Sequence, residues 1–112
     1  MRQNTMMRRP SVTEKDIAQL EQKAGEAAQL LKLLANENRL LILCRLAIAG
    51  EMPVGALAQA TKLSQSALSQ HLAKMREDGL VATRRDAQTI YYRIADQNAA
   101  RLLALLKDIY CP

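Results

Sequence analysis

Apolar residues in the N-terminal part of the chain recur at the three- and four-residue spacing of an amphipathic helix over residues 13–35. Thr13 is the expected N-cap of this segment, and Asp16 three residues later resembles a weak capping box. Gly25 lies in the middle and is expected to divide the segment into two helices, because glycine is unfavourable inside a helix.

Two further helices are expected from the same spacing. One covers residues 36–49 and stops at Gly50, and the last begins at Asp96 or Asn98. In the first, the residues expected to face inward are Leu40, Leu43, Ala47 and Ile48. The last helix has a wide apolar face that resembles a dimer surface, made of Ala99, Leu102, Leu103, Leu106, Ile109 and Tyr110.

Residues 54–79 predict a short helix, a tight turn at residues 61–63 and a longer helix. Ser64 is the expected N-cap of the longer helix, and Gly79 is its stop. Leu68, Leu72 and Met75 then fall on one buried stripe. A short helix, a turn and a longer helix together are typical of a helix-turn-helix DNA reader.

The opposite face of the longer helix carries short, uncharged polar side chains, which suit hydrogen bonding to base edges in the major groove. The expected DNA-contacting residues on this face are Gln65, Ser66, Ser69 and Gln70. His71 follows them and is expected to be structural or to face the DNA, not to bind a metal. The alternative for the whole face is an ordinary solvated helix surface.

Residues 80–94 predict a β-hairpin, since apolar and polar residues alternate near its end and residues 86–88 suit a turn. A hairpin directly after a recognition helix is typical of a wing. The residues expected to reach phosphates or a minor groove from it are Arg84, Arg85, Tyr91 and Arg93. The alternative is a solvated strand edge protected by its charges.

The elements in order give α-α-α-α-α-β-β-α, a mainly α winged helix-turn-helix with a β-hairpin wing. We expect residues 1–12 to be a disordered basic tail and residues 13–112 to form one DNA-binding and dimerisation domain. A helix-turn-helix followed by a wing within 112 residues indicates a DNA-binding winged helix far more specifically than either part alone.

The net charge of +5 agrees with a nucleic-acid partner, because the positive excess lies in residues 1–12 and 61–94. This excess is modest, so one copy would bind double-stranded DNA weakly, and a homodimer is expected. The longest apolar stretch is interrupted by Arg39, Arg45 and Glu51, and the first residues lack a signal-peptide core. A cytoplasmic protein with no membrane partner is therefore expected.

The chain resembles the ArsR/SmtB family of small dimeric bacterial repressors over roughly residues 16–110. The similar segments are LKLLANENRLLIL at 31–43, SQSALSQHL at 64–72, MREDGLV at 75–81 and RRDAQTIYYR at 84–93. The resemblance implies a homodimeric repressor that leaves its inverted-repeat operator when it senses a chemical signal. Ala87 departs from the glycine that many members have at the wing tip, so the turn needs a positive φ at a non-glycine residue or another form.

Metals and cofactors are not expected. Family members that sense metals use a Cys-x-Cys pair before the reading helices or Asp and His on the last helix. In this chain residues 51–54, which precede the reading helices, contain no cysteine, and the last helix contains no histidine. One histidine and two cysteines do not readily assemble a thiolate- or imidazole-rich site.

The two cysteines are the remaining candidates for chemistry. On its own, Cys44 on an apolar helix is most simply a small core residue. Cys111 is more unusual, because an exposed tail rarely keeps a free thiol without a use. In a reducing cytoplasm a static disulfide is unexpected, whereas a switching one is the usual exception.

The contexts LILCRL around Cys44 and LKDIYCP around Cys111 resemble the BigR/SqrR branch of the family. That resemblance implies that persulfides or oxidants are the inducer. It makes Cys44 the attacking thiolate and Cys111 the resolving thiol, and the product a disulfide or a polysulfide bridge.

Three other functions remain open at this level. The first is a repressor of the same family with a different inducer, and the second is a winged helix that binds proteins in place of DNA. The third is a thiol-dependent enzyme, which is not expected because no base is paired with either cysteine and no Cys-x-x-Cys is present.

Overall fold

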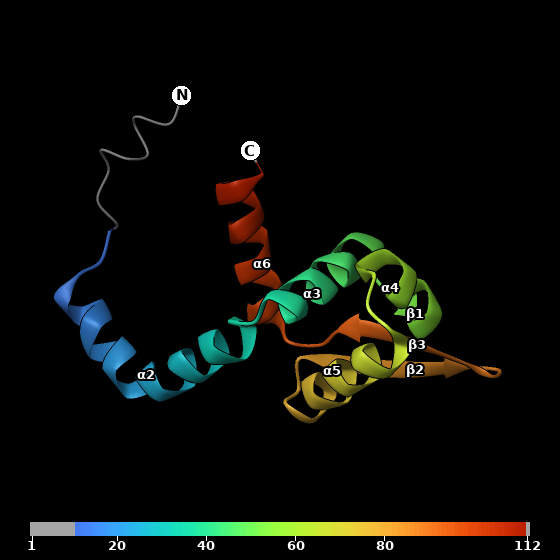
Figure 1. Ribbon diagram of the computed structural model, residues 1–112. Coiled ribbons are helices and arrows are strands. Elements are labelled where there is room, and N and C mark those ends of the chain that lie inside the picture. The colour runs from blue at the N-terminus through green and yellow to red at the C-terminus, as the bar shows by residue number, and fades with distance from the viewer. Residues whose placement is uncertain (1–10, 112) are drawn as a thin grey trace. The chain divides into compact units, whose positions relative to one another are not determined.

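A computed structural model describes residues 11–111 of the chain. Contacts within the chain divide it into two compact units, residues 1–30 and residues 31–112. The described elements are α2 (Glu14–Leu34), α3 (Glu37–Ala49), β1 (Met52–Pro53), α4 (Val54–Thr61), α5 (Gln65–Glu77), β2 (Val81–Asp86), β3 (Thr89–Ile94) and α6 (Gln97–Tyr110) (Figure 1).

The N-terminal unit contains most of α2, whose start is a full capping box. The Thr13 N–H donates to Asp16 Oδ2 at 3.0 Å, and the Asp16 N–H donates to Thr13 Oγ1 at 3.1 Å. These hydrogen bonds hold the pKa of the Asp16 carboxyl below its ordinary value. The prediction that Gly25 divides the helix is wrong, since α2 is continuous through it. One glycine costs a helix only about 1 kcal/mol, which strong helix formers on both sides offset.

The second unit is built around α3, which begins and ends as expected. Asn36 caps its N-terminus by accepting a hydrogen bond from the Arg39 N–H, and Gly50 ends it with a φ of 85°. The side chains of Ile42, Leu43 and Leu46 are buried. Of the four residues expected to face inward, Leu43 is buried and Leu40 is half-buried. The prediction is wrong for Ala47 and Ile48, which are exposed.

The core of this unit is made of aliphatic side chains from every layer around α3. Its fully buried members are Ile42, Leu43, Leu46, Leu57, Leu68, Leu72, Met75 and Leu80. Because they come from α3, α4, α5 and the start of the wing, one core holds the helix-turn-helix against the hairpin.

The sheet has three antiparallel strands in the order β1-β3-β2, whereas the sequence predicted only the hairpin. The short β1 pairs Met52 with Tyr92 and Pro53 with Tyr91. Two residues that include a proline carry no strand pattern, so only the pairing with β3 defines this strand. At the wing tip Ala87 has a φ of 58°, so the first of the two turn forms open to a non-glycine residue is the one present.

The predicted fold class is confirmed: the described residues form a mainly α winged helix with a β-hairpin wing, in which one long helix replaces the two expected at the start. Residues 1–10 of the predicted disordered tail lie outside the described residues, so the tail stays a prediction. No helix between residues 11 and 111 is long and apolar enough to cross a membrane.

Candidate functional site

The helix α5 has the geometry expected of a recognition helix. The Ser64 hydroxyl accepts a hydrogen bond from the Ala67 N–H at 3.1 Å, so the cap predicted from the sequence is present. Leu68, Leu72 and Met75 are buried and fix the helix against the core. The turn before it ends α4 at Lys62, which has a left-handed φ of 62°. The helix is thus rigidly held with its other face outward.

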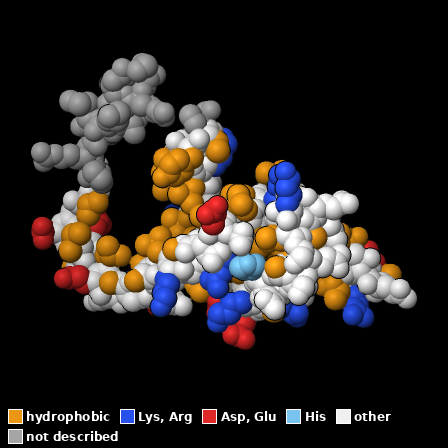
Figure 2. Space-filling model, in the orientation of Figure 1, with side chains coloured by type: hydrophobic (Ala, Val, Ile, Leu, Met, Phe, Trp, Pro, Cys, Tyr) orange, Lys and Arg blue, Asp and Glu red, His pale blue; other side chains and the backbone are white. Residues whose placement is uncertain are grey.

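The outward face of α5 carries the side chains predicted to read bases. Gln65, Ser66, Ser69 and Gln70 are exposed, and the neighbouring His71 is half-buried. Lys74, one turn later, lies 3.4 Å from Glu77 and 3.5 Å from Asp78, so acidic neighbours partly neutralise its charge. Lys and Arg side chains gather over α5 and the wing in Figure 2, which suits a DNA backbone on both sides of this face.

The wing holds a charge cluster that the sequence did not indicate. The Arg84 guanidinium forms an ion pair with Glu51, and Arg84 Nε donates to both oxygens of that carboxylate at 2.9 and 3.2 Å. Arg84 Cζ also lies 4.6 Å from the centroid of the Tyr91 ring. The hydrogen bonds to Arg84 hold the pKa of Glu51 below its ordinary value and raise that of Arg84.

The two wing arginines predicted to hold phosphates therefore differ. Arg84 and Tyr91 are partners across β2 and β3, and the guanidinium is already engaged by Glu51. Arg85 is the next residue along the strand, so its side chain points to the opposite face of the sheet. Within residues 11–111 it is exposed and has no ionic partner.

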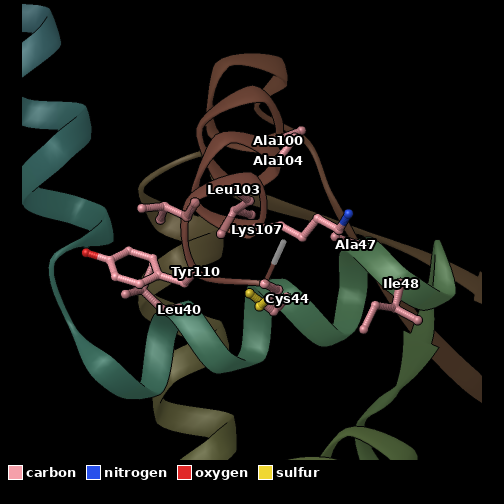
Figure 3. Close-up of a pocket in the computed structure, with 11 residues that line it drawn as sticks. Leu40, Cys44, Ala47, Ile48, Ala100, Leu103, Ala104, Lys107 and Tyr110 are labelled. Carbon is pink, nitrogen blue, oxygen red and sulfur yellow. The ribbon is translucent and has the colours of Figure 1, made fainter. Parts of the chain in front are cut away.

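Both cysteines line one pocket of about 580 Å³ between α3 and α6 (Figure 3). The lining is almost wholly apolar and consists of Leu40, Cys44, Ala47, Ile48, Ala100, Leu103, Ala104, Leu106, Lys107, Tyr110 and Cys111. The residues predicted as a thiol pair are 67 positions apart in the sequence, yet the fold brings them to the same cavity.

Both thiols are free, and Figure 3 shows Cys44 on α3 facing the pocket that Cys111 also lines. Cys44 is exposed as a residue, so it is not the core residue that its apolar context suggested. Its sulfur is nevertheless partly desolvated, and this burial, together with the nearby Cys111 thiolate, raises the pKa of Cys44. A raised pKa counts against an attacking thiolate at neutral pH, because the thiolate is the nucleophile.

The described residues offer little to a metal ion. Between residues 11 and 111 no three His, Cys, Asp or Glu side chains gather in a group that would hold one. The prediction that the inducer is not a metal stays a prediction.

Sequence reasoning missed Glu51 and Lys107. Glu51 was noted only as a break in an apolar stretch and as one of the residues where family members have a thiolate, and its partner Arg84 is 33 residues away. Lys107 is the charged residue in the pocket lining, one helical turn before Cys111. The only available signal was this four-residue spacing, which places the two on one helix face.

A buried-core helix-turn-helix, an outward polar recognition face and a hairpin wing together define a winged-helix DNA-binding regulator. The family described as "Bacterial regulatory protein, arsR family" matches residues 36–83, which cover α3, the helix-turn-helix and the start of the wing.

Known transcriptional regulators are similar to this chain over most of its length. The HTH-type transcriptional regulator YgaV of Escherichia coli is 46% identical over 97 residues, which are 87% of this chain and 98% of YgaV. The transcriptional activator HlyU of Vibrio cholerae is 46% identical over 86% of this chain and 88% of its own. The crystal structure of the transcriptional repressor BigR from Xylella fastidiosa superposes with a TM-score of 0.78 at 40% identity, covering 90% of this chain and 99% of BigR.

The chain belongs to the arsR family of bacterial regulatory proteins. It is a DNA-binding transcriptional regulator and not an enzyme, as predicted.

Proposed function

We propose that the protein is a homodimeric repressor that releases its operator when Cys44 and Cys111 become bridged by reactive sulfur species or oxidants. The observation that carries this proposal is the meeting of the two thiols in one pocket. A thiol in the middle of α3 and a thiol at the end of α6 have no structural need to share a cavity, whereas a switch needs them there.

The DNA side of the proposal rests on the outward face of α5 and on Arg85 of the wing. The exposed amide and hydroxyl side chains, such as Gln70, suit base edges, and the exposed guanidinium suits a phosphate. Of the relatives compared, BigR is named a repressor and HlyU an activator. Repression is assigned here from the resemblance of the two cysteine contexts to the BigR/SqrR branch.

The homodimer is supported by apolar side chains that one copy leaves in water. On α6, Leu105, Ile109 and Tyr110 are exposed by 53%, 51% and 76%. The orange side chains over this helix in Figure 2 show the same feature. A second copy that covers this face would also double the DNA contacts, with half-sites roughly 34 Å apart on an inverted repeat. Sedimentation of the purified protein tests this, and a monomer at micromolar concentration contradicts it.

The bridging reaction balances without a further redox partner when the inducer is a persulfide. One thiol takes the sulfane sulfur of RSSH and becomes a protein persulfide, and RSH leaves. The other thiol then attacks the inner sulfur, which forms a disulfide and expels H₂S. A second sulfane transfer before closure gives a trisulfide in the same way. With a peroxide, the first product is a sulfenic acid, and closure expels water.

The bridge would act on DNA binding through α3. It would tie the end of α6 to the middle of α3, and α3 leads through β1 into the helix-turn-helix. A 100-fold loss of operator affinity corresponds to about 2.7 kcal/mol of difference between the bridged and reduced states. The bridge therefore has to strain the DNA-bound form more than the free form by this amount.

The deciding experiment measures operator affinity before and after treatment with an organic persulfide. We expect the parent protein to release DNA, and we expect Cys44→Ser and Cys111→Ser each to bind as the reduced parent does but to lose the response. Mass spectrometry of the treated parent counts the sulfur atoms in the bridge. If both single variants still release DNA like the parent, the cysteines are not the sensor. Zinc added to the double Cys→Ser variant is the control, and release there would point to a metal inducer.

A further inference from the structure

One residue that carries a charge, Lys107, contributes to the lining of the pocket that holds the two thiols. Lys107 and Cys111 are one turn apart on α6, and the Cys111 N–H donates to the Lys107 carbonyl at 2.7 Å. In Figure 3 the Lys107 side chain extends from α6 toward Ala47 of α3, with its nitrogen at the far end. The Lys107 side chain thus forms part of the pocket wall on the α6 side.

The pocket therefore has an apolar interior, and the cationic end of Lys107 lies apart from it. The alkyl parts of Leu40, Ile48 and Leu103 surround a space in which a sulfur atom is readily accommodated but a charged group is not. A donor that places its sulfur beside Cys44 must leave its own charged group near solvent. At that position a carboxylate meets the Lys107 ammonium, whereas an ammonium group on the donor meets a like charge.

The raised pKa of Cys44 gives no sign that a cation activates its thiol. The causes of the raised pKa of Cys44 are its own burial and the Cys111 thiolate, and Lys107 is not among them. A lysine placed to activate the thiol would lower that pKa.

We propose that Lys107 makes this pocket selective for anionic sulfur donors, namely organic persulfides that carry a carboxylate. Lys107 is a specificity-determining residue that touches the donor and takes no part in the sulfur transfer. In that transfer the thiolate sulfur bonds to the sulfane sulfur, the bond to the donor's inner sulfur breaks, and the donor leaves as RSH after taking up a proton. The selectivity concerns the same pocket as the proposed sensing function and rests on it for its biological role.

The test uses three methanethiosulfonate reagents that undergo one reaction and differ in charge. The protein thiolate bonds to the alkylthio sulfur of each reagent as the S–SO₂ bond breaks and methanesulfinate leaves, so a disulfide forms without another reactant. The reagents are the anionic sulfonatoethyl, the neutral methyl and the cationic trimethylammonioethyl compounds. Rates are measured on the full chain carrying Cys111→Ser, in which Cys44 is the one remaining thiol.

The quantity compared is the ratio of the rate of the anionic reagent to that of the cationic reagent. We expect this ratio to be higher for the protein than for a small free thiol. Lys107→Met should lower this rate ratio by up to about 25-fold, because a unit charge near 4 Å in water favours the anion and disfavours the cation by about five-fold each. Lys107→Arg should keep the ratio, and high salt should reduce it in the parent. Arg101→Met removes an equal charge from the same helix outside the pocket lining, and it should leave the ratio unchanged.

Two results would overturn the selectivity. One is an unchanged ratio in Lys107→Met, and the other is an equal loss in Arg101→Met, which would assign the effect to the overall charge of the protein. A second assay separates this proposal from the sensing function. It compares DNA release by a carboxylate-bearing persulfide and by its amide in the parent chain. If neither releases DNA, the sensing function fails whatever the reagent ratio. If both release DNA equally well, the sensing function holds and the selectivity fails.

Discussion

Arg84 on the wing and Glu51 after α3 are joined by a forked hydrogen bond, in which Arg84 Nε lies 2.9 and 3.2 Å from the two carboxylate oxygens. Glu51 follows the end of α3, the helix that carries Cys44, and directly precedes β1. The pair therefore links the proposed sensor helix to the wing, over the ring of Tyr91. It also occupies an arginine that would otherwise be available to a phosphate.

Glu51→Gln should strengthen DNA binding, because it removes the carboxylate that competes with phosphate for Arg84. We expect an affinity gain of roughly five-fold and a salt dependence steeper by about one counterion. Titration of a labelled duplex at several salt concentrations measures both quantities. Asp108→Asn on α6 makes the same change in net charge away from the wing and should have a much smaller effect. Weaker binding by Glu51→Gln would mean instead that the ion pair's main role is to place the wing.

Gln70→Ala and Arg85→Ala should impair binding in different ways. Loss of the Gln70 amide should cost about 1–3 kcal/mol and relax specificity at one base pair. Loss of the Arg85 guanidinium should weaken binding to all DNA sequences alike and reduce the slope of log affinity against log salt concentration by about one. Binding to a panel of single-base operator variants separates the two patterns. Gln97→Ala at the start of α6 is the matched control for the amide. The same pattern in both variants would refute these roles.

The alkylation of Cys44 should be slow at neutral pH and should speed up toward alkaline pH. Partial burial and the Cys111 thiolate both raise its pKa, so the thiolate fraction near pH 7 is smaller than that of an ordinary cysteine. Cys111→Ser removes the second cause, so the midpoint of the rate profile should move to lower pH while staying above the ordinary range. Iodoacetamide labelling followed by peptide mass spectrometry gives both profiles. A Cys44 midpoint at or below that of a free cysteine peptide would disprove the desolvation.

Ala87→Gly should stabilise the protein. Ala87 has a φ of 58°, a left-handed conformation that costs a non-glycine residue roughly 1–2 kcal/mol. Glycine relieves this strain but adds entropy to the unfolded chain, so a net gain of about 0.5–1 kcal/mol is expected. Urea unfolding measures it. Ala73→Gly, on the exposed side of α5, has ordinary helical geometry and should lose about 1 kcal/mol. A loss in both variants would mean that the turn tolerates alanine without strain.

Much of this protein follows from local sequence, because its signals act over a few residues. Ser64 caps its helix by accepting a hydrogen bond from the backbone N–H three residues on, as its position predicted. Asn36 caps α3 in the same way. The buried stripe of α5 and the turn strain at Ala87 were likewise readable, since helix periodicity and the sterics of φ are properties of the chain itself.

Local sequence misled where neighbouring preferences compete. Gly25 favours a break, but the helix formers around it carry α2 across. Ala47 and Ile48 fit an inward stripe, yet Ile48 is 81% exposed because Ile42, Leu43 and Leu46 occupy the core side of α3. Which stripe of an apolar helix is buried depends on where its neighbours lie.

The sequence by itself determined the helix-turn-helix, the wing and the identity of the two thiols. Only the tertiary structure decided that Cys44 and Cys111 share a pocket, that Lys107 lines it and that Glu51 holds Arg84. Such contacts join residues dozens of positions apart, and no local periodicity encodes them. They exist because burial of the common aliphatic core fixes where α3, α6 and the wing lie with respect to one another.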